Sequence, residues 1–200
     1  MTMKIYGARQ SRASRVIWCA NELGVPYEFI DIPWENQKNP DFLAINPCGK
    51  FPGFVDGDLK LFESLAINLY VAKKYGTGEL YPTAVEDEAR TFQWTLWAAA
   101  EVEPNAIPSL MVQIGRSKDT AGAAAAAEKL KPALKILNDC LKDRDYLLGK
   151  KFSIADLNVA AVMSMTRGGK IDISYAPNVV AWLERCLARP ARTAAPKVKE

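Results

Sequence analysis

The sequence predicts an α/β domain followed by an all-helical domain. Residues 1–75 alternate short apolar runs with helical patterns, whereas every long segment beyond residue 87 has helical spacing. Between them lies a stretch of Gly, Thr, Pro and acidic residues that is typical of an interdomain linker. The chain has 200 residues, 49% of them apolar and 24% charged, which suits two compact units. We therefore expect an α/β domain over 1–76, a linker over 77–86 and an all-α domain over 87–200.

The first domain has the predicted element order βαβ, short α, ββα. In chain order the patterns predict a strand over 3–6, a helix over 14–23, a strand over 27–32, a short helix near 41–44, strands at 54–55 and 59–62, and a helix over 65–75. Gly24 and Gly76 end the two long helices, and Asp56-Gly57-Asp58 is a hairpin signal between the last two strands. This is the thioredoxin-like order, in which a mixed four-stranded sheet carries helices on its faces.

The second domain is predicted to be built from helices alone. The patterns predict a long helix over 87–111 bent by Pro104 and Pro108, an Ala-rich helix over 121–142 with a kink at Pro132, and a helix over 178–188. Ser153 and Asp156 have the spacing of a capping box, to which we assign a structural role. The charges of residues 185–199 are spread among Ala and Pro, so we expect a solvated tail there.

Composition and charge exclude several classes of partner. The 26 basic and 23 acidic residues give a net charge of +3 without a basic stripe, so we expect no nucleic-acid partner. The four cysteines form no CxxC pair and the chain has no histidine, so we expect no metal site. No segment approaches the ~20 apolar residues of a membrane span or has the pattern of a signal peptide. We therefore expect a cytoplasmic protein with no membrane partner.

Ser11 follows the first predicted strand and stands at the start of the first predicted helix. Serine is a preferred N-cap residue, and taken alone this explains its presence. The same position suits chemistry, because a hydroxyl and free N–H groups at a helix N-terminus favour an anion and lower the pKa of a thiol held there. Both interpretations stay open, and the second makes Ser11 a candidate activator of a ligand's thiol.

A loop with two prolines leads into the third strand, with the sequence Asn46-Pro47-Cys48-Gly49-Lys50-Phe51-Pro52. If the peptide bond before Pro52 is cis, the Phe51 N–H and C=O face outward and can pair with another backbone. The alternative is a rigid turn with a hydrophobic plug, and the sequence favours neither.

Glu63 and Ser64 lie where the fourth strand passes into a helix. The first turn of that helix offers unpaired N–H donors and a hydroxyl, which suit a carboxylate ligand, and Glu63 can accept from an α-ammonium group. The pair is therefore a candidate receptor for an amino-acid head. Plain helix capping is the alternative.

Taken together, these motifs resemble the cytosolic glutathione transferases in order and spacing. The resemblance covers residues 3–190 and rests on Ser11, Asn46-Pro47-x-Gly49-Lys50-x-Pro52, Asp56-Gly57-Asp58, Leu61-Phe62-Glu63-Ser64-x-Ala66-Ile67 and the Ser153-to-Asp156 box. The pattern is similar to the serine-type classes, phi- or theta-like or a bacterial relative, and most of all to the plant phi-like class. The resemblance implies a homodimeric detoxification enzyme with glutathione as co-substrate and no metal.

The resemblance also implies roles for single residues. Ser11 would stabilise the glutathione thiolate, which attacks an electrophilic, apolar co-substrate. The implied contacts to glutathione form three groups: Glu63 and Ser64 at the γ-glutamyl group, Phe51 and Pro52 at the cysteinyl residue, and Gln37, Lys38 and Lys50 near the glycyl carboxylate.

Two departures from the family pattern bear on the site. Gln37 stands where a histidine is often found near the glycyl end, and Ser14 is a second hydroxyl that could replace Ser11. A serine at position 11, where other members have cysteine, disfavours disulfide reduction, with Cys48 as a minor redox candidate. Peroxide reduction, ether cleavage, and a non-catalytic binding or scaffold role are the alternatives to conjugation.

The co-substrate pocket is expected in the all-α domain. The candidates for its walls are Trp34, Trp97, Glu101, Met111 and Val112. Aromatic and Met residues at helical spacing are more often core, which is the alternative for each of them.

Overall fold

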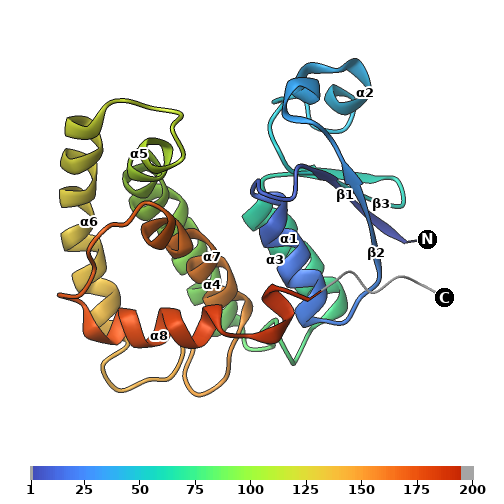
Figure 1. Ribbon diagram of the computed structural model, residues 1–200. Helices are drawn as coiled ribbons and strands as arrows, with labels where there is room; N and C mark the ends of the chain where they lie inside the picture. Colours follow the sequence, from blue (N-terminus) through green and yellow to red (C-terminus); the bar gives the residue numbers. More distant parts are fainter. Residues whose placement is uncertain (1, 195–200) are drawn as a thin grey trace. The chain divides into compact units, whose positions relative to one another are not determined.

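The computed structural model describes residues 2–194, and these divide into two compact units (Figure 1). The first unit holds residues 2–81 together with residues 189–194, and the second holds residues 82–188. Each unit has its own hydrophobic core, with Ile5 and Phe54 fully buried in the first and Leu130 and Trp182 in the second. An α/β unit is thus followed in the chain by an all-helical one, which confirms the predicted fold class.

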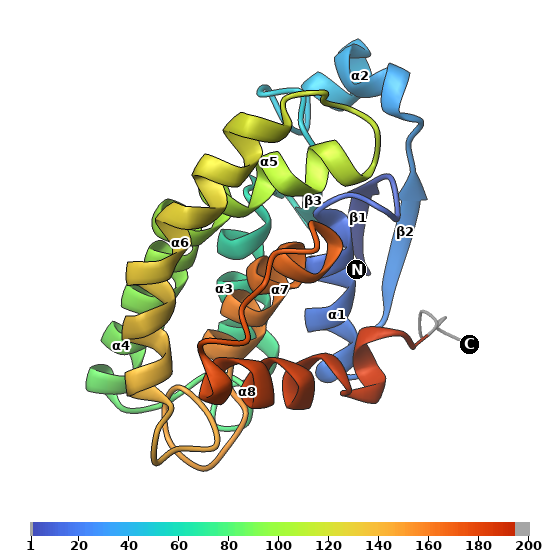
Figure 2. The same ribbon diagram turned by 60° about the vertical axis from the view of Figure 1, so that its left-hand side comes forward.

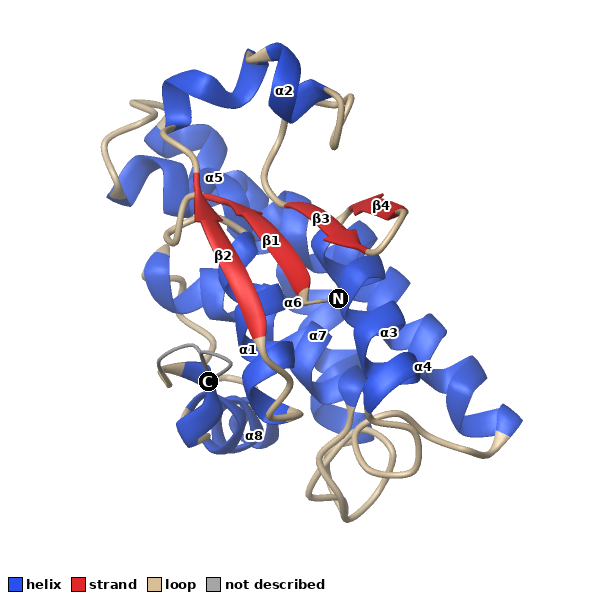
Figure 3. Cartoon of the chain, turned by 90° about the vertical axis from the view of Figure 1, so that its right-hand side faces the viewer, coloured by secondary structure: helices blue, strands red, loops and turns tan. Residues whose placement is uncertain are grey.

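The first unit is a thioredoxin-like domain. Its elements are β1 (Met3–Gly7), α1 (Ala13–Glu22), β2 (Tyr27–Asp31), the 3₁₀ helix η1 (Trp34–Lys38), α2 (Pro40–Leu43), β3 (Gly53–Asp56), β4 (Leu59–Phe62) and α3 (Ser64–Tyr75). The strand order is β2-β1-β3-β4, with β1 parallel to β2 and β3 antiparallel to both β1 and β4. Helices α1 and α3 pack together and cover one face of this sheet (Figure 3). The helix η1 was not predicted.

The turn between β3 and β4 is tied to the far end of α3 by Asp56. Gly57 has a φ of 63°, a left-handed conformation that the tight hairpin turn requires and glycine adopts without strain. The buried Asp56 carboxylate accepts hydrogen bonds from Tyr70 (3.0 Å), Lys74 (2.7 Å) and Tyr75 (2.9 Å) through Oδ2. Burial alone raises the pKa of Asp56, but the three donors outweigh it and the pKa lies below its usual range.

Residues 189–194 return to the first unit and pack against α1. Arg189 forms a two-pronged ion pair with Glu22, with both N···O distances at 2.7 Å. Asn21 donates to the carbonyl oxygens of Ala191 and Ala194, each at 3.0 Å. The predicted solvated tail is therefore wrong for residues 189–194, because α1 presents a buried carboxylate and an amide that pair with them. Residues 195–199 of that prediction lie outside the described residues.

The second unit is built from helices (Figure 2). These are α4 (Val85–Trp97), α5 (Glu103–Gln113), α6 (Thr120–Cys140), α7 (Ile154–Gly168) and α8 (Pro177–Leu187). A π-helical turn, Ala98–Val102, joins α4 to α5, so the long bent helix predicted over 87–111 is three helical pieces in a row. Helix α7 packs against α4, α5 and α8. Among the described residues, no helix has the length and apolar character needed to cross a membrane.

The start of α7 is organised around Asp156. The predicted capping box between Ser153 and Asp156 is present, and the carboxylate accepts from the Ser153 N–H at 3.0 Å and hydroxyl at 2.7 Å. Its other oxygen accepts from the Leu147 N–H at 2.8 Å and from the Trp182 indole N–H at 2.9 Å. Asp156 is fully buried, and this burial raises its pKa although the four donors oppose the shift. The residue thus joins α8 and the loop before α7 to the start of α7.

Candidate functional site

Ser11 lies in the turn that leads from β1 into α1. Its hydroxyl donates to the Ala8 carbonyl at 2.6 Å and accepts from the Ala13 N–H at 3.1 Å, so it caps one free donor of the first turn. The Ser11 N–H also donates to the Ala8 carbonyl, at 2.9 Å. The first turn of α1, all of it described, has no acidic side chain to offset the positive end of the helix dipole.

Ser14 is placed differently from Ser11. It lies inside α1, its side chain is exposed, and its hydroxyl donates to the Ser11 carbonyl at 2.9 Å. The Ser14 N–H donates to the same carbonyl at 3.1 Å. Ser11 therefore precedes Arg12, the N-cap residue of α1, and its hydroxyl lies at the start of the helix, whereas the Ser14 hydroxyl points back along the first turn.

The loop between α2 and β3 is held in shape by Asn46. The Asn46 amide donates to the carbonyl oxygens of Lys50 and Pro52, the latter at 3.1 Å, and its oxygen accepts from the Cys48 N–H at 3.0 Å. A buried amide that satisfies three backbone groups fixes the path of the whole loop. No separate role was predicted for Asn46 within its motif, although Asn before a Pro-rich turn is a signal for side-chain to backbone bonding.

The peptide bond between Phe51 and Pro52 is cis, one of the two alternatives left open by the sequence. No described residue forms a hydrogen bond with the Phe51 N–H or C=O. The Phe51 ring packs against Phe42 and Trp34, with centroid distances of 5.2 and 5.3 Å. The side chain is therefore anchored while the backbone is left with its donor and acceptor unpaired among the described residues.

Glu63 and Ser64 form the junction between β4 and α3. Glu63 is exposed and has a φ of 69°, a left-handed conformation that costs a non-glycine residue on the order of 1–3 kcal/mol. No side chain caps the start of α3, and its first turn, which is fully described, has no acidic residue. Strained backbone beside a helix N-terminus fits a ligand-binding role for this junction.

A contact from α1 joins the thiol end of the candidate site to this junction. The Arg15 Nη1 lies 3.3 Å from the Ser64 Oγ, and both residues are buried. Because Arg15 is one turn from Ser11, the first turns of α1 and α3 adjoin in the same unit. Arg15 was not predicted as a site residue, since a helical arginine one turn beyond a serine has no local signal for a long-range contact.

The three residues expected near the glycyl end lie on η1 and on the loop held by Asn46. Lys38 donates from Nζ to the Cys48 carbonyl at 3.3 Å, which brings η1 against that loop. A Cβ added at Gly49 would lie 3.0 Å from the Gln37 carbonyl oxygen and 2.6 Å from the Lys38 Nζ, so Gly49 allows this close approach. Lys50 is exposed on the same loop. The three residues thus belong to two adjoining segments, with Gln37 and Lys38 on η1 and Lys50 on the loop held by Asn46.

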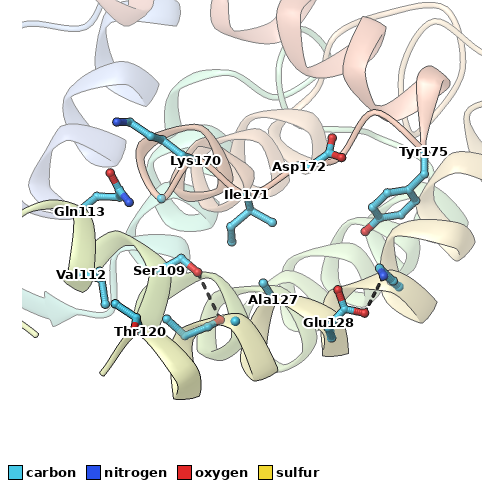
Figure 4. Close-up of a pocket in the computed structure, with 14 residues that line it drawn as sticks. Ser109, Val112, Gln113, Thr120, Ala127, Glu128, Lys170, Ile171, Asp172 and Tyr175 are labelled. Carbon is cyan, nitrogen blue, oxygen red and sulfur yellow. Dashed lines mark hydrogen bonds and ion pairs between the residues drawn. The ribbon is translucent and has the colours of Figure 1, made fainter. Parts of the chain in front are cut away.

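A cavity of about 470 Å³ lies within the second unit (Figure 4). It is bounded by α5, by the first half of α6 and by the segment that follows α7. The short side chains of Ala123, Ala124 and Ala127 leave this space, so the Ala-rich character of α6 produces the cavity. At one end Tyr175 lies beside Glu128 and Asp172, and burial and then these carboxylates raise the pKa of Tyr175 above its usual value.

The expected co-substrate residues are not gathered in this cavity. Val112 lines it, whereas Trp97, Glu101 and Met111 do not. Trp34 belongs to the first unit, where it packs against Phe51. Val112 lines the cavity while its neighbour Met111 does not, because adjacent residues of an α-helix lie about 100° apart around the helix axis.

The buried or partly buried thiols of Cys19 and Cys140 are poorly suited to act as nucleophiles. Burial, and then the nearby Glu22, raises the pKa of the Cys19 thiol far above neutral pH. Burial also raises the pKa of the Cys140 thiol, partly opposed by Arg144. Cys48 is exposed on the loop held by Asn46. Among the described residues, no group of three or more His, Cys, Asp or Glu side chains is arranged to hold a metal ion.

Comparisons with known proteins agree with this architecture. Residues 1–73 match the family described as glutathione S-transferase, N-terminal domain, and residues 99–190 match glutathione S-transferase, C-terminal domain. Glutathione S-transferase 3 of Zea mays is 38% identical over 205 residues, covering 94% of this chain and 90% of the relative.

Solved structures of the same kind superpose closely. The crystal structure of glutathione transferase F7 from Populus trichocarpa is 31% identical, covers 96% of each chain and has a TM-score of 0.85. The structure of a glutathione S-transferase-I bound with the ligand lactoylglutathione is also 31% identical with a TM-score of 0.85, covering 96% of this chain and 97% of that one.

Proposed function

Since the chain belongs to the glutathione S-transferase family and is a glutathione transferase, we propose that Ser11 stabilises the thiolate of bound glutathione and that this thiolate attacks an electrophilic, apolar co-substrate. The observation that carries the proposal is the place of the Ser11 hydroxyl at the N-terminus of α1, one turn from Arg15 and its contact to Ser64. The thiol and the γ-glutamyl end of one ligand can then be held by a single unit.

Ser11 can turn its hydroxyl toward a thiolate at little cost. The Ala8 carbonyl accepts both the Ser11 hydroxyl at 2.6 Å and the Ser11 N–H at 2.9 Å, so it keeps one partner when the hydroxyl rotates away. The Ala13 N–H still donates to the Ser11 oxygen, which polarises the O–H bond and strengthens it as a donor. Ser14, exposed and bonded to the Ser11 carbonyl, offers no comparable arrangement.

The size of the effect on the thiol follows from one charged hydrogen bond. Such a bond contributes roughly 1.5–3 kcal/mol, and one pKa unit corresponds to about 1.36 kcal/mol. Ser11 would therefore lower the pKa of the thiol by about one to two units from ~8.5. The positive end of α1 acts in the same direction. A large share of the bound glutathione would then be ionised near neutral pH.

We propose the following contacts for glutathione. The γ-glutamyl carboxylate binds the N-terminus of α3 at Ser64, with its ammonium group at the Glu63 carboxylate. The cysteinyl backbone pairs with the N–H and C=O of Phe51, which have no partner among the described residues. Positive charge at Lys38 and Lys50 supports binding of the glycyl carboxylate, with Gln37 beside them.

We propose that the second unit supplies apolar surface for the co-substrate. Its cavity of about 470 Å³ is within the range of small-molecule sites, and Val112, Ile171 and the alanines of α6 give it apolar walls. The electrophile is thus expected to be a compact molecule with an apolar body.

We also propose a homodimer. Val85, Phe92 and Leu96 of α4 are 68%, 43% and 68% exposed and follow one face of the helix at spacings of seven and four residues. Leu59 and Phe62 of β4 are exposed as well. Exposed large apolar side chains at helical spacing support a subunit interface, and sedimentation analysis of wild type and Leu96→Lys would test it.

A cytoplasmic location stays a prediction. Its support is the sequence composition and the cysteines, which are free. Fractionation of cells that express the chain would test it.

Binding and turnover are tested together on one preparation. The proposal predicts retention on immobilised glutathione, elution by free glutathione, and conjugation of a chlorodinitrobenzene substrate. Peroxides and aryl ethers form the other arms of the panel, because the same thiolate can reduce a peroxide or cleave an ether. If the protein is retained on glutathione and turns over peroxides or ethers but does not conjugate, the proposed conjugation reaction is wrong. The role of Ser11 in stabilising the thiolate would then stand. Failure to bind glutathione would overturn the proposal.

A further inference from the structure

Arg15 is a buried cation to which the proposed function assigns no contact with the ligand and no role of its own. It is 5% exposed, lies in the first half of α1 and donates from Nη1 to the Ser64 hydroxyl oxygen across the α1–α3 contact. An arginine side chain remains charged at all working pH values and has donors only. Burying such a group costs free energy, so we expect its contacts to stabilise the fold or to serve function.

The contact fixes how the Ser64 hydroxyl can be used. A serine hydroxyl has one donor and two acceptor positions, and Arg15 can only occupy an acceptor position. Ser64 is the first residue of α3, so its hydroxyl has no carbonyl one turn earlier in the helix to donate to. No described residue accepts a hydrogen bond from it. The Ser64 proton is thus left available for a group outside the protein.

We propose that Arg15 is a positioning residue for the γ-glutamyl carboxylate and acts through Ser64. Its guanidinium holds the Ser64 oxygen and directs the Ser64 O–H to the ligand. This inference rests on the proposed glutathione site. It differs from a purely structural role because its effect must depend on the γ-glutamyl group.

The test compares two thiols that differ in that group, glutathione and cysteinylglycine. Dissociation constants and kcat/KM for both are measured in wild type, Arg15→Met and Arg15→Lys, with circular dichroism and thermal unfolding as checks of folding. Arg15→Met is expected to weaken glutathione binding by about tenfold or more, since a hydrogen bond that involves a charged group is lost. The dissociation constant and kcat/KM of Arg15→Met for cysteinylglycine are expected to stay within about twofold of wild type, because that thiol lacks the γ-glutamyl carboxylate.

Two further variants assign the effect. In a Ser64→Ala background, Arg15→Met is expected to add little, because interacting residues are not additive. Arg9→Met removes the same charge from the same unit at a side chain that packs over Phe29, and is expected to leave both thiols unaffected. Arg15→Lys keeps the charge but loses the planar fork, and should restore part of the glutathione affinity. If Arg15→Met does not fold, the Arg15→Lys variant carries the same comparison.

The outcomes separate this inference from the proposed function. Equal losses for glutathione and cysteinylglycine, or the full Arg15→Met loss in the Ser64→Ala background, would overturn the positioning role. Unchanged glutathione affinity in Ser64→Ala itself, or equal use of the two thiols by wild type, would instead overturn the proposed γ-glutamyl site.

Discussion

At the scale of single residues, the chemistry depends on side chains that the backbone has already oriented. Ser11 satisfies the Ala13 N–H as a cap, and that bond prepares its hydroxyl to donate to an anion. Asn46 likewise orients the loop before β3, because its amide donates to the carbonyl oxygens of Lys50 and Pro52 and so fixes the position of the Phe51–Pro52 peptide. Capping and turn stabilisation are therefore part of the proposed function and do not compete with it.

Asp56 makes a pH-dependent contribution to stability. Hydrogen bonds from Lys74, Tyr75 and Tyr70 outweigh the effect of burial and lower the pKa of Asp56 in the folded chain. A carboxyl with a depressed folded pKa stabilises the fold fully above its unfolded value of ~3.9, and loses this contribution as the pH falls through the folded value. Asp56→Asn is thus expected to lower the free energy of unfolding by about 1.5 kcal/mol at pH 7.

Urea unfolding of wild type and Asp56→Asn as a function of pH measures this difference. It should be constant above about pH 5 and shrink in stronger acid. Asp58→Asn, an exposed carboxylate on the same hairpin, is the control and should change little. A difference that grows in acid would contradict the sign of the Asp56 shift.

The sequence predicted residues whose signal is local. Ser11 after a strand and Glu63-Ser64 before a helix are marked by their neighbours in the chain. The Arg15–Ser64 bond joins residues 49 positions apart, and nothing near either residue indicates it. The left-handed conformation of Glu63 was not predicted either, because glutamate has no preference for it.

At the scale of secondary structure, Asp156 determines how α7 begins. Its carboxylate accepts from Ser153, Leu147 and Trp182, so its loss leaves buried donors unpaired in three segments of the unit. Asp156→Ala is expected to lower the free energy of unfolding by at least about 3 kcal/mol, since each buried donor without a partner costs about 1–3 kcal/mol. Thermal unfolding measures the effect.

Asp156→Asn serves as the matched variant. It keeps one acceptor oxygen and should therefore lose less stability than Asp156→Ala. Asp139→Ala, an exposed helical carboxylate paired with Lys135, should lose little. Equal stability of Asp156→Ala and Asp139→Ala would contradict the role of Asp156 in the core.

The cavity beside α6 gives a test of the co-substrate proposal. Ala127 lines it and Ala125, two residues earlier, does not and is exposed. Ala127→Leu is expected to raise the KM for an apolar electrophile severalfold by filling the space, with glutathione affinity unchanged. Ala125→Leu adds the same bulk outside the cavity and should leave the KM unchanged. Identical kinetics for both variants would exclude the cavity as a co-substrate site.

Periodicity predicted most helices and strands but not their interruptions. The pattern over 87–111 predicted one long helix bent at Pro104 and Pro108, whereas the structure has α4, a π-helical turn and α5 in a row. The π-helical turn at Ala98–Val102 lies before both prolines and consists mostly of alanine, so it has no signal in sequence. Likewise η1, a single irregular turn of Trp34–Lys38, is too short to show a period.

At the scale of the whole molecule, the chain returns to its first unit after completing the second. Arg189 and Glu22 make this connection, and Glu22 is only 7% exposed at its side chain. Arg189→Ala is expected to lower the stability of the full chain by about 2 kcal/mol, because it leaves a mostly buried carboxylate without this partner. Urea unfolding measures the loss, and Arg192→Ala, at an exposed arginine of the same returning segment 189–194, is the control.

A double-mutant cycle with Glu22→Gln assigns the loss to this pair. If Arg189 acts through Glu22, the second substitution adds much less than it does in wild type. Additive losses would show that Arg189 stabilises the chain by other contacts. The sequence could not predict this pair, because its members are 167 residues apart and the charges around Arg189 resemble those of a solvated tail.

The most direct test of the central claim is the pKa of the thiol of bound glutathione, followed by the ultraviolet absorbance of the thiolate as the pH is raised. In wild type and in Ser14→Ala the pKa should lie about one to two units below that of free glutathione. In Ser11→Ala it should rise by most of that difference while glutathione affinity changes by only a few-fold, and thermal unfolding checks the loss of the cap. An unchanged thiol pKa in Ser11→Ala, or a rise in Ser14→Ala in its place, would contradict the role assigned to Ser11.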